Sequence, residues 1–402
     1  MAKTPGFSFF VLSDTRKRIL SLCGAAVLLF FVNGLPSPSP IENGNELIEL
    51  TNEGKACLAI LMFAITLWVS EAVPFPITSL FVLVLIPAFG ISDYESVVRS
   101  GFGNPLITFF IGVLFLSTGF TRSGLGARLV VFVLRNLGTR SDRVLLGFLL
   151  VGALLSMWIT DMAVAALLLP LGVGVLRDAG LKPGESNFGR SLMIACAYGP
   201  LIGGISTPAG TGANLAALGY LSELAGIEIS FVRWMAYGVP ASLLMIPIGW
   251  WILLWFFPPE LEQLPINDDD VARQASKLGP LSRLEIWTLI VFSGTVVAWL
   301  VSPLLNELSK GLIDLPVQAV ALCGGLLLFV PGLEVQSWKQ AQHDMDWGGV
   351  ILIVAGLSIG VMVFETGAAR WLAQLMLGRL PLVPVFLQPF VIVIVVASLH
   401  LL

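Results

Sequence analysis

The sequence predicts an all-α, polytopic membrane protein. Of its 402 residues, 56% are hydrophobic and only 12% are charged, against about 25% charged residues in an average soluble domain. The mean hydropathy is +0.90, and uncharged segments long enough for membrane-spanning helices recur along the chain. So few charges exclude a soluble enzyme and a disordered chain, and the long apolar segments disfavour a transmembrane barrel.

Charge and cysteine usage exclude further classes of protein. The net charge is -4, and there is no basic cluster beyond residues 16–18, which disfavours nucleic-acid binding. The four cysteines lie in apolar segments without Cys-x-x-Cys spacing, and the two histidines are isolated, so we expect no redox centre and no cofactor. An intramembrane hydrolase would need an intramembrane aspartate pair, a Ser-His dyad or an HExxH motif, and none of these is found, so we do not expect an enzyme.

Residues 1–54 are expected to hold an N-terminal tail, a first transmembrane helix over 19–32 and an external loop. A signal peptide is the alternative for this helix, but residues 33–36 make a poor cleavage site. Basic residues precede the helix and acidic residues follow it, which places the N-terminus in the cytoplasm. We expect a multi-pass protein of the plasma (cell inner) membrane.

Residues 55–257 are expected to form a first structural repeat. Its simple spans are predicted over 55–73, 77–89, 105–120 and 231–257. In the segment 127–137, arginines lie seven residues apart on an otherwise apolar helix. That pattern fits either a helix lying in the membrane interface or a cytoplasmic extension of the preceding span.

The segment 144–176 is predicted to be a re-entrant helical hairpin. As one helix it would be about 50 Å long, against a hydrocarbon core of about 30 Å, whereas two full spans need about 40 residues. Basic residues flank both ends, so the segment enters and leaves on the same side. Its polar turn, near Asp161, would lie at mid-membrane, where non-helical backbone is tolerated only inside protein or along a cavity.

The segment 191–222 is predicted to be a discontinuous transmembrane helix. Its middle, 203–214, contains four glycines, one proline and two threonines, which cannot continue a regular helix. Two helix ends then face a pocket, one with free N–H groups and the other with free carbonyls.

A second series of spans follows the polar cytoplasmic linker 258–283. Its segments are 284–301, 316–330, 347–364 and 383 onward. By the span count this series starts on the opposite side of the membrane, so residues 284–402 are predicted to be a second, inverted repeat, the usual build of a secondary transporter. The segment from 383 would match the first arm of the hairpin, so we expect this repeat, and the chain, to be incomplete.

Several stretches together resemble the divalent anion/sodium symporter family. The most specific is 202–215, with its glycines and Thr207, Thr211 and Asn214; residues 67–78, 102–104, 156–159 and 345–348 also match. The resemblance covers nearly the whole chain. It implies elevator-type transport of a dicarboxylate, citrate or sulfate, coupled to Na+ or H+, by a homodimer of inverted-repeat protomers with an interfacial helix as hinge arm.

A cation site is predicted where the hairpin turn meets the broken helix. Na+ needs several oxygen ligands, which helix breaks supply as carbonyls and hydroxyls. Ser156 and Thr160 are one helical turn apart, Asp161 follows, and Gly210 would bring bare carbonyls across from the broken helix. We therefore expect Ser156, Thr160, Asp161 and Gly210 to hold Na+. Asn214 can donate to an anion.

The resemblance also implies a substrate site, and this chain departs from the family there. The substrate-binding positions are Thr160, Asp161, Met162, Thr207, Thr211 and Asn214. The family's usual Ser-Asn-Thr turn reads Thr160-Asp161-Met162 here. A carboxylate at mid-membrane is costly, so we expect Asp161 to be a cation ligand or proton carrier rather than a silent substitution that reaches water. An anion would then bind only once Na+ or H+ neutralises Asp161.

Two alternative functions remain open on the sequence alone. Asp161 makes a cation/proton antiporter or an oxyanion exporter of the same superfamily plausible, and the altered turn makes a non-transporting relative plausible. The tryptophans, Trp158 and Trp234 among them, are expected to be core or interface-belt residues.

Overall fold

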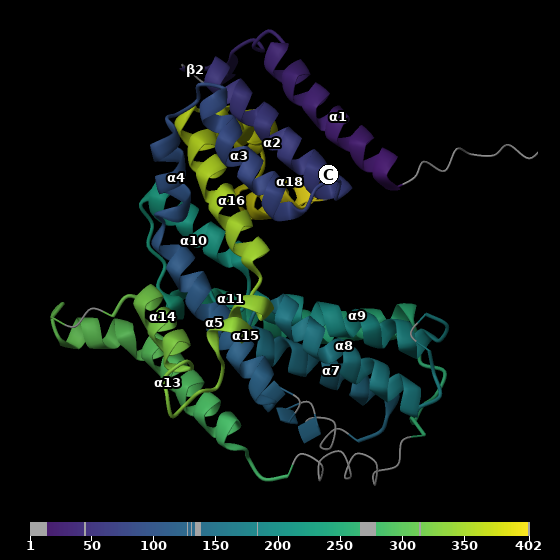
Figure 1. Cartoon of the computed structure of the whole chain (residues 1–402). Helices are drawn as coiled ribbons and strands as arrows, with labels where there is room; N and C mark the ends of the chain where they lie inside the picture. Colours follow the sequence, from purple (N-terminus) through teal and green to yellow (C-terminus); the bar gives the residue numbers. More distant parts are fainter. Residues whose placement is uncertain are drawn as a thin grey trace, which may run out of the picture. The chain divides into compact units, whose positions relative to one another are not determined.

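Two compact units make up the fold in the computed structural model, which is shown in Figure 1. One unit comprises residues 1–103 with 351–402, and the other comprises residues 104–350. The structure describes residues 14–43, 46–126, 128–129, 131–132, 138–182, 184–265, 279–312 and 315–400.

The first unit consists of helices and one small antiparallel β-hairpin. Thr51 starts α2 because its Oγ1 accepts from Gly54 N at 2.9 Å, and the same hydroxyl donates to Thr366 O. Ser358 Oγ donates to Val97 O at 2.8 Å and so joins α16 to α4. The elements are α1 (Asp14–Gly34), β1 (Ile41–Asn43), β2 (Glu46–Ile48), α2 (Asn52–Ser70), α3 (Phe75–Ala88), α4 (Tyr94–Phe102), most of α16 (Trp347–Glu365), α17 (Ala368–Leu377), the 3₁₀ turns η1 (Leu380–Leu382) and η2 (Val385–Leu387), and α18 (Gln388–His400).

The named elements of the second unit are all helices, and an isolated antiparallel β-bridge joins Arg140 to Gln263. Its elements are α5 (Pro105–Ser123), α7 (Ser141–Ser156), α8 (Asp161–Asp178), α9 (Asn187–Gly204), α10 (Gly212–Ala225), α11 (Phe231–Phe256), α13 (Arg283–Leu308), α14 (Val317–Leu327) and α15 (Trp338–Asp344). Helices α7, α8 and α9 lie side by side (Figure 1). Helix α5 packs along α14 and α13.

Six helices in the described residues are long and apolar enough to cross a membrane. They are α1, α2, α5, α11, α13 and α16; α3, α14 and α18 are apolar but shorter. Apart from the short hairpin β1–β2, the regular structure of the described residues is helical. The predicted all-α, polytopic membrane fold is confirmed.

Both predicted helix breaks are present in the second unit. The segment 144–176 divides between α7 and α8 at residues 157–160. The segment 191–222 divides between α9 and α10 at residues 205–211. The position of these breaks in a bilayer, and the inverted repeat itself, stay predictions.

Several boundaries differ from those expected. Helix α13 continues past residue 301, because Pro303 is accommodated inside it. The span expected from 383 begins only with α18 at Gln388, after prolines and two 3₁₀ turns. Helix α15 was not expected, although Ser337 and Gln340 form a capping box at its start. Much of the segment 127–137, and residues 266–278 of the linker, lie outside the described residues.

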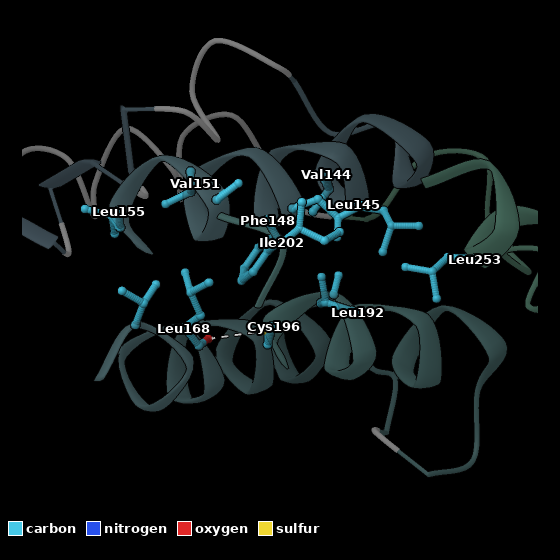
Figure 2. Packing of buried hydrophobic residues seen from close by; sticks show 14 of the residues in the cluster. Val144, Leu145, Phe148, Val151, Leu155, Leu168, Leu192, Cys196, Ile202 and Leu253 are labelled. Carbon is cyan, nitrogen blue, oxygen red and sulfur yellow. Dashed lines mark hydrogen bonds between the residues drawn. The ribbon is translucent and has the colours of Figure 1, made fainter. Parts of the chain in front are cut away.

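The core of the second unit lies between the hairpin helices and α9, as Figure 2 shows. Apolar side chains from four helices fill this space and exclude water, which is the main source of packing stability. The residues labelled in Figure 2 are Val144, Leu145, Phe148, Val151 and Leu155 of α7, Leu168 of α8, Leu192, Cys196 and Ile202 of α9, and Leu253 of α11.

Helices α7 and α9 approach so closely that a side chain does not fit at the crossing. A Cβ atom added to Gly203 would collide with the backbone carbonyl and Cα of Ala153. Backbone cannot give way as a flexible side chain can. Gly203 therefore lets the end of α9 lie against the end of α7.

Substituting Gly203 tests this close approach. We expect Gly203→Ala to lower the free energy of unfolding by about 1–3 kcal/mol, because the added methyl group overpacks the crossing. Gly174→Ala in α8 is the matched control, since a Cβ there meets nothing within 4 Å and alanine favours the helix by about 1 kcal/mol. Equal thermal unfolding midpoints for the two variants would contradict the packing described.

Glu260, just beyond α11, caps the start of α9. Its carboxylate accepts hydrogen bonds from the backbone N–H groups of Asn187 and Phe188, which have no partner within the helix. Partial burial raises the pKa of the Glu260 carboxyl, but these two hydrogen bonds outweigh that effect and lower the pKa below its ordinary value. The ionised carboxylate therefore stabilises the folded chain.

The capping role predicts a pH dependence. A carboxyl whose pKa is lowered on folding contributes stability above its unfolded pKa and loses it as the pH falls through the folded pKa. Glu260→Gln should therefore lower the thermal unfolding midpoint at pH 7, and the difference from the wild type should shrink as the pH falls below the ordinary glutamate pKa of 4.5 and vanish below the lowered pKa of the folded chain. A difference that stays constant from pH 7 to pH 3 would rule out the ionised cap.

Candidate functional site

The hairpin turn, residues 157–160, joins α7 to α8 without glycine or proline. Trp158 N and Ile159 N both still bond to Leu155 O, so α7 tightens at its end. Thr160 then adopts φ -57° and ψ 138°, which ends the helical run. Asp161 is the first residue of α8, and its Oδ1 accepts from Met162 N at 2.9 Å. A carboxylate is favoured at this position, because a helix N-terminus carries partial positive charge.

The break in the other segment, residues 205–211, is a compact turn. Thr207 Oγ1 accepts from Ala209 N at 3.2 Å, and Thr211 is fully extended at φ -151° before α10 begins. Pro208 has no N–H to continue a helix. Asn214 Nδ2 donates to Gly204 O at 2.8 Å and to Thr207 O at 2.7 Å, so its amide closes the turn.

The hairpin turn and the break contact each other through backbone groups. Asp161 N donates to Gly210 O at 3.1 Å, and Thr207 Oγ1 donates to Met157 O. A Cβ on Gly210 would lie 2.6 Å from Ser156 O and would also collide with Gly204 O, so only glycine fits there. Two segments about 50 residues apart therefore form one polar centre inside an apolar unit.

Ser156 supplies a hydroxyl to this centre that lacks a protein partner. Its side chain is 0% exposed, and Oγ makes no hydrogen bond within the described residues. A buried, unsatisfied hydroxyl costs free energy, so a ligand at this position would regain it. Gly204 and Gly210 border it on the broken helix.

The other predicted site residues differ in how far their side chains are exposed to solvent. Thr160 is buried, and its side chain makes no capping hydrogen bond to α8. Asp161 is half-buried and interacts with the Thr211 side chain. Met162 is 72% exposed. Asn214 donates to backbone carbonyls in this conformation, so its expected contact with an anion stays a prediction.

Four helix ends give the centre its electrostatic character. Helices α7 and α9 end here, at Ser156 and Gly204, with carbonyls that lack helical partners. Helices α8 and α10 begin here, at Asp161 and Gly212, so the positive ends of two helix dipoles lie at the centre. Carbonyl ends attract cations and N–H ends attract anions, so the centre can hold a cation and an anion side by side.

Sequence reasoning missed the contribution of α11 to this centre. Trp234, expected in the core or at the membrane interface, donates its Nε1–H to Ile205 O at 3.0 Å. Ser242 accepts from Ser206 Oγ and donates to Ile202 O, each at 2.7 Å. An aromatic or serine residue in an apolar helix gives no sequence signal for such a contact.

Comparison with known proteins identifies the family. The chain matches the family described as "Sodium:sulfate symporter transmembrane region" over residues 18–402. The chain belongs to the sodium:sulfate symporter family. The resemblance stated from the sequence is thereby confirmed, and so is the expectation that the chain is not an enzyme, since the family and its named relatives are transporters.

Individual relatives are moderately similar. A protein of Staphylococcus saprophyticus named "Sodium-dependent dicarboxylate transporter SdcS" is 30% identical over 361 residues, which cover 86% of this chain and 68% of that protein. The protein of the same name from Staphylococcus aureus is 28% identical over 341 residues, covering 81% of this chain and 65% of its own length. A "Membrane protein" of Cupriavidus necator is 26% identical over 368 residues. The chain thus spans about two thirds of the length of these relatives.

The buried hydroxyl of Ser156 allows a test of the cation site of this sodium:sulfate symporter family member. Ser156→Ala removes no protein hydrogen bond, so we expect the thermal unfolding midpoint without Na+ to stay unchanged or rise slightly. The Na+ concentration for half-maximal stabilisation should rise roughly tenfold, as for a lost interaction of about 1.4 kcal/mol.

Ser191→Ala in α9 is the matched control. Its hydroxyl is equally buried but donates to Phe188 O within its own helix, away from the breaks. This variant should have a lower thermal unfolding midpoint but keep the wild-type Na+ midpoint, which is the Na+ concentration for half-maximal stabilisation. If Ser156→Ala also keeps that midpoint, Ser156 is not part of the cation site.

Proposed function

We propose that this chain carries out secondary active transport of a divalent anion coupled to Na+. The observation that supports it best is the backbone contact between Asp161 N and Gly210 O, which joins two helix breaks into one polar centre. Family membership supports the same reaction class. A secondary transporter needs such a centre because lipid excludes ions unless peptide oxygens and N–H groups replace their water.

In this proposal the cation binds first. Carbonyl and hydroxyl oxygens of Ser156, Thr160 and the Gly210 turn, with the carboxylate of Asp161, surround Na+. The bound cation offsets the charge of Asp161, and the positive dipole ends at the starts of α8 and α10 then attract the anion. Coupling follows, because the anion meets net repulsion until the cation is present.

The substrate is proposed to be a dicarboxylate, citrate or sulfate. Relatives named for sodium-dependent dicarboxylate transport support a dicarboxylate, and the name of the family supports sulfate. The residues expected to contact it are Thr160, Asp161, Met162, Thr207, Thr211 and Asn214. Met162 lacks the hydroxyl found at this position in the family, which favours a substrate held mainly by the break and the helix N-termini.

The architecture around the site is proposed to follow the family pattern. An elevator-type motion, a homodimer, a plasma-membrane location and a cytoplasmic N-terminus come from the resemblance and the charge pattern. The inverted repeat gains support from α5 and α16, since each is followed by a left-handed glycine, Gly124 at φ 90° and Gly367 at φ 76°. These glycines occupy matched positions in the two halves of the sequence.

Thermal stability of the purified chain against succinate, citrate and sulfate tests the substrate. We expect at least one of these anions to raise the unfolding midpoint in NaCl and to have no effect in choline chloride of equal ionic strength. An anion effect that is the same with and without Na+ would contradict coupling. Uptake into vesicles by the full-length protein separates a carrier from a non-transporting relative.

Asp161 determines whether Na+ or H+ is the coupling ion. Asp161→Asn restores the amide of the usual family turn, so we expect it to shift the Na+ and pH dependence of anion stabilisation while leaving folding nearly unchanged. Asp178→Asn, at the other end of α8 beside Arg177, is the matched control and should shift neither. Identical Na+ and pH dependence in Asp161→Asn and the wild type would exclude Asp161 from coupling.

A further inference from the structure

We infer that Phe231 and Trp234, one helical turn apart at the start of α11, are positioning residues that set the distance between the hairpin turn and the helix break. The inference rests on the proposed function, since the distance matters only if the two breaks share an ion. Neither residue belongs to the predicted site.

Phe231 holds the hairpin turn through an aromatic stack. Its ring lies 6.4 Å from the ring of Trp158, which belongs to the turn, with an interplanar angle of 16°. On its other side it lies 4.9 Å from the ring of Trp299 in α13, at 21°. Both spacings fall in the range of attractive aromatic pairs. Phe231 therefore packs between the hairpin turn and α13.

Trp299 anchors this aromatic stack in the second unit. It is 1% exposed, its Nε1–H donates to Val317 O at 3.1 Å, and its ring contacts that of Phe109 in α5 at 5.7 Å. Phe231 itself is 2% exposed. Phe231 and Trp299 are buried and Trp158 is half-buried, so the anchored stack restricts the motion of Trp158 and of the turn that carries it.

Trp234 holds the other side of the centre. Its hydrogen bond to Ile205 O fixes the first residue of the break, and Ser242, two turns further along α11, holds Ile202 O and Ser206 Oγ. Residues three, four or eight apart lie on one face of a helix. One face of α11 thus contacts the turn at Phe231 and the break at Trp234 and Ser242.

A rigid helix that contacts both sides fixes their separation. Ion sites tolerate displacements of only about 0.5 Å before affinity falls. Ser156 O, Gly204 O and Gly210 O converge where the two segments meet, so a shift of either segment changes the space left for a cation. Phe231 and Trp234 should therefore affect Na+ affinity without contacting the ion.

The test separates positioning from simple packing. In the purified full chain, the unfolding midpoint is measured against NaCl concentration, with choline chloride keeping ionic strength constant. Trp234→Phe removes the N–H donor and replaces the indole by a smaller aromatic ring, and Phe231→Leu removes the aromatic ring but keeps an apolar side chain. We expect each variant to raise the Na+ concentration for half-maximal stabilisation roughly three- to tenfold, as for loss of one buried hydrogen bond or aromatic pair.

Two controls carry the same chemical changes away from the centre. Trp251→Phe alters an exposed tryptophan further along α11, which stacks only on Trp255 among the described aromatic pairs. Phe292→Leu removes a ring that pairs with Phe120 at 5.3 Å. Both control variants should need the same Na+ concentration as the wild type for half-maximal stabilisation, even if their thermal unfolding midpoints are lower.

The outcomes distinguish this inference from the proposed function. If the wild type is stabilised by Na+ but Trp234→Phe and Phe231→Leu keep its Na+ midpoint, positioning by α11 is wrong and the proposed function stands. If the wild type shows no Na+-specific stabilisation, the proposed function and this inference both fail. If the two controls also need more Na+ for half-maximal stabilisation, the inference is overturned as well, since any loss of packing would then weaken Na+ binding.

Discussion

Peptide groups that leave a helix inside a membrane need partners that lipid cannot supply. In this chain two non-helical stretches supply partners to each other, through Asp161 N with Gly210 O and Thr207 Oγ1 with Met157 O. The arrangement of the second unit depends on that pairing. Helix α9 has to lie against α7 for the breaks to meet, and Gly203 at their crossing leaves room for it. Apolar side chains of α7, α8, α9 and α11 pack around this pairing.

Under the proposed function, the same pairing lets the centre hold ions. Two helix C-termini, at Ser156 and Gly204, bring carbonyls together, and two N-termini, at Asp161 and Gly212, bring N–H groups together. A cation and an anion placed there attract each other as well as the helix ends. In the proposed mechanism the carboxylate of Asp161, where the family usually has an amide, adds negative charge and makes anion binding depend more strongly on a bound cation than asparagine would.

The two helix breaks could be predicted from local composition. The tertiary contacts could not. The charge of Asp161 marks the first break in the sequence, and the glycines and the proline of 203–214 mark the second, because such residues interrupt a regular apolar helix. The continuation of α13 through Pro303 depends on packing that no short window contains. The roles of Asn214 and Trp234 as donors to backbone carbonyls were missed for the same reason. A tryptophan in an apolar helix has the same sequence signal whether it faces lipid, core or a polar turn.

Hydrogen exchange of the full chain in lipid nanodiscs tests the central claim most directly. The backbone N–H groups of 157–161 and 205–212 are followed by mass spectrometry in NaCl and in choline chloride. If the two breaks hold an ion together, Na+ slows exchange in both segments and leaves the middle of α11 unchanged. Equal exchange in the two salts, or a change confined to one break, would contradict a shared cation site.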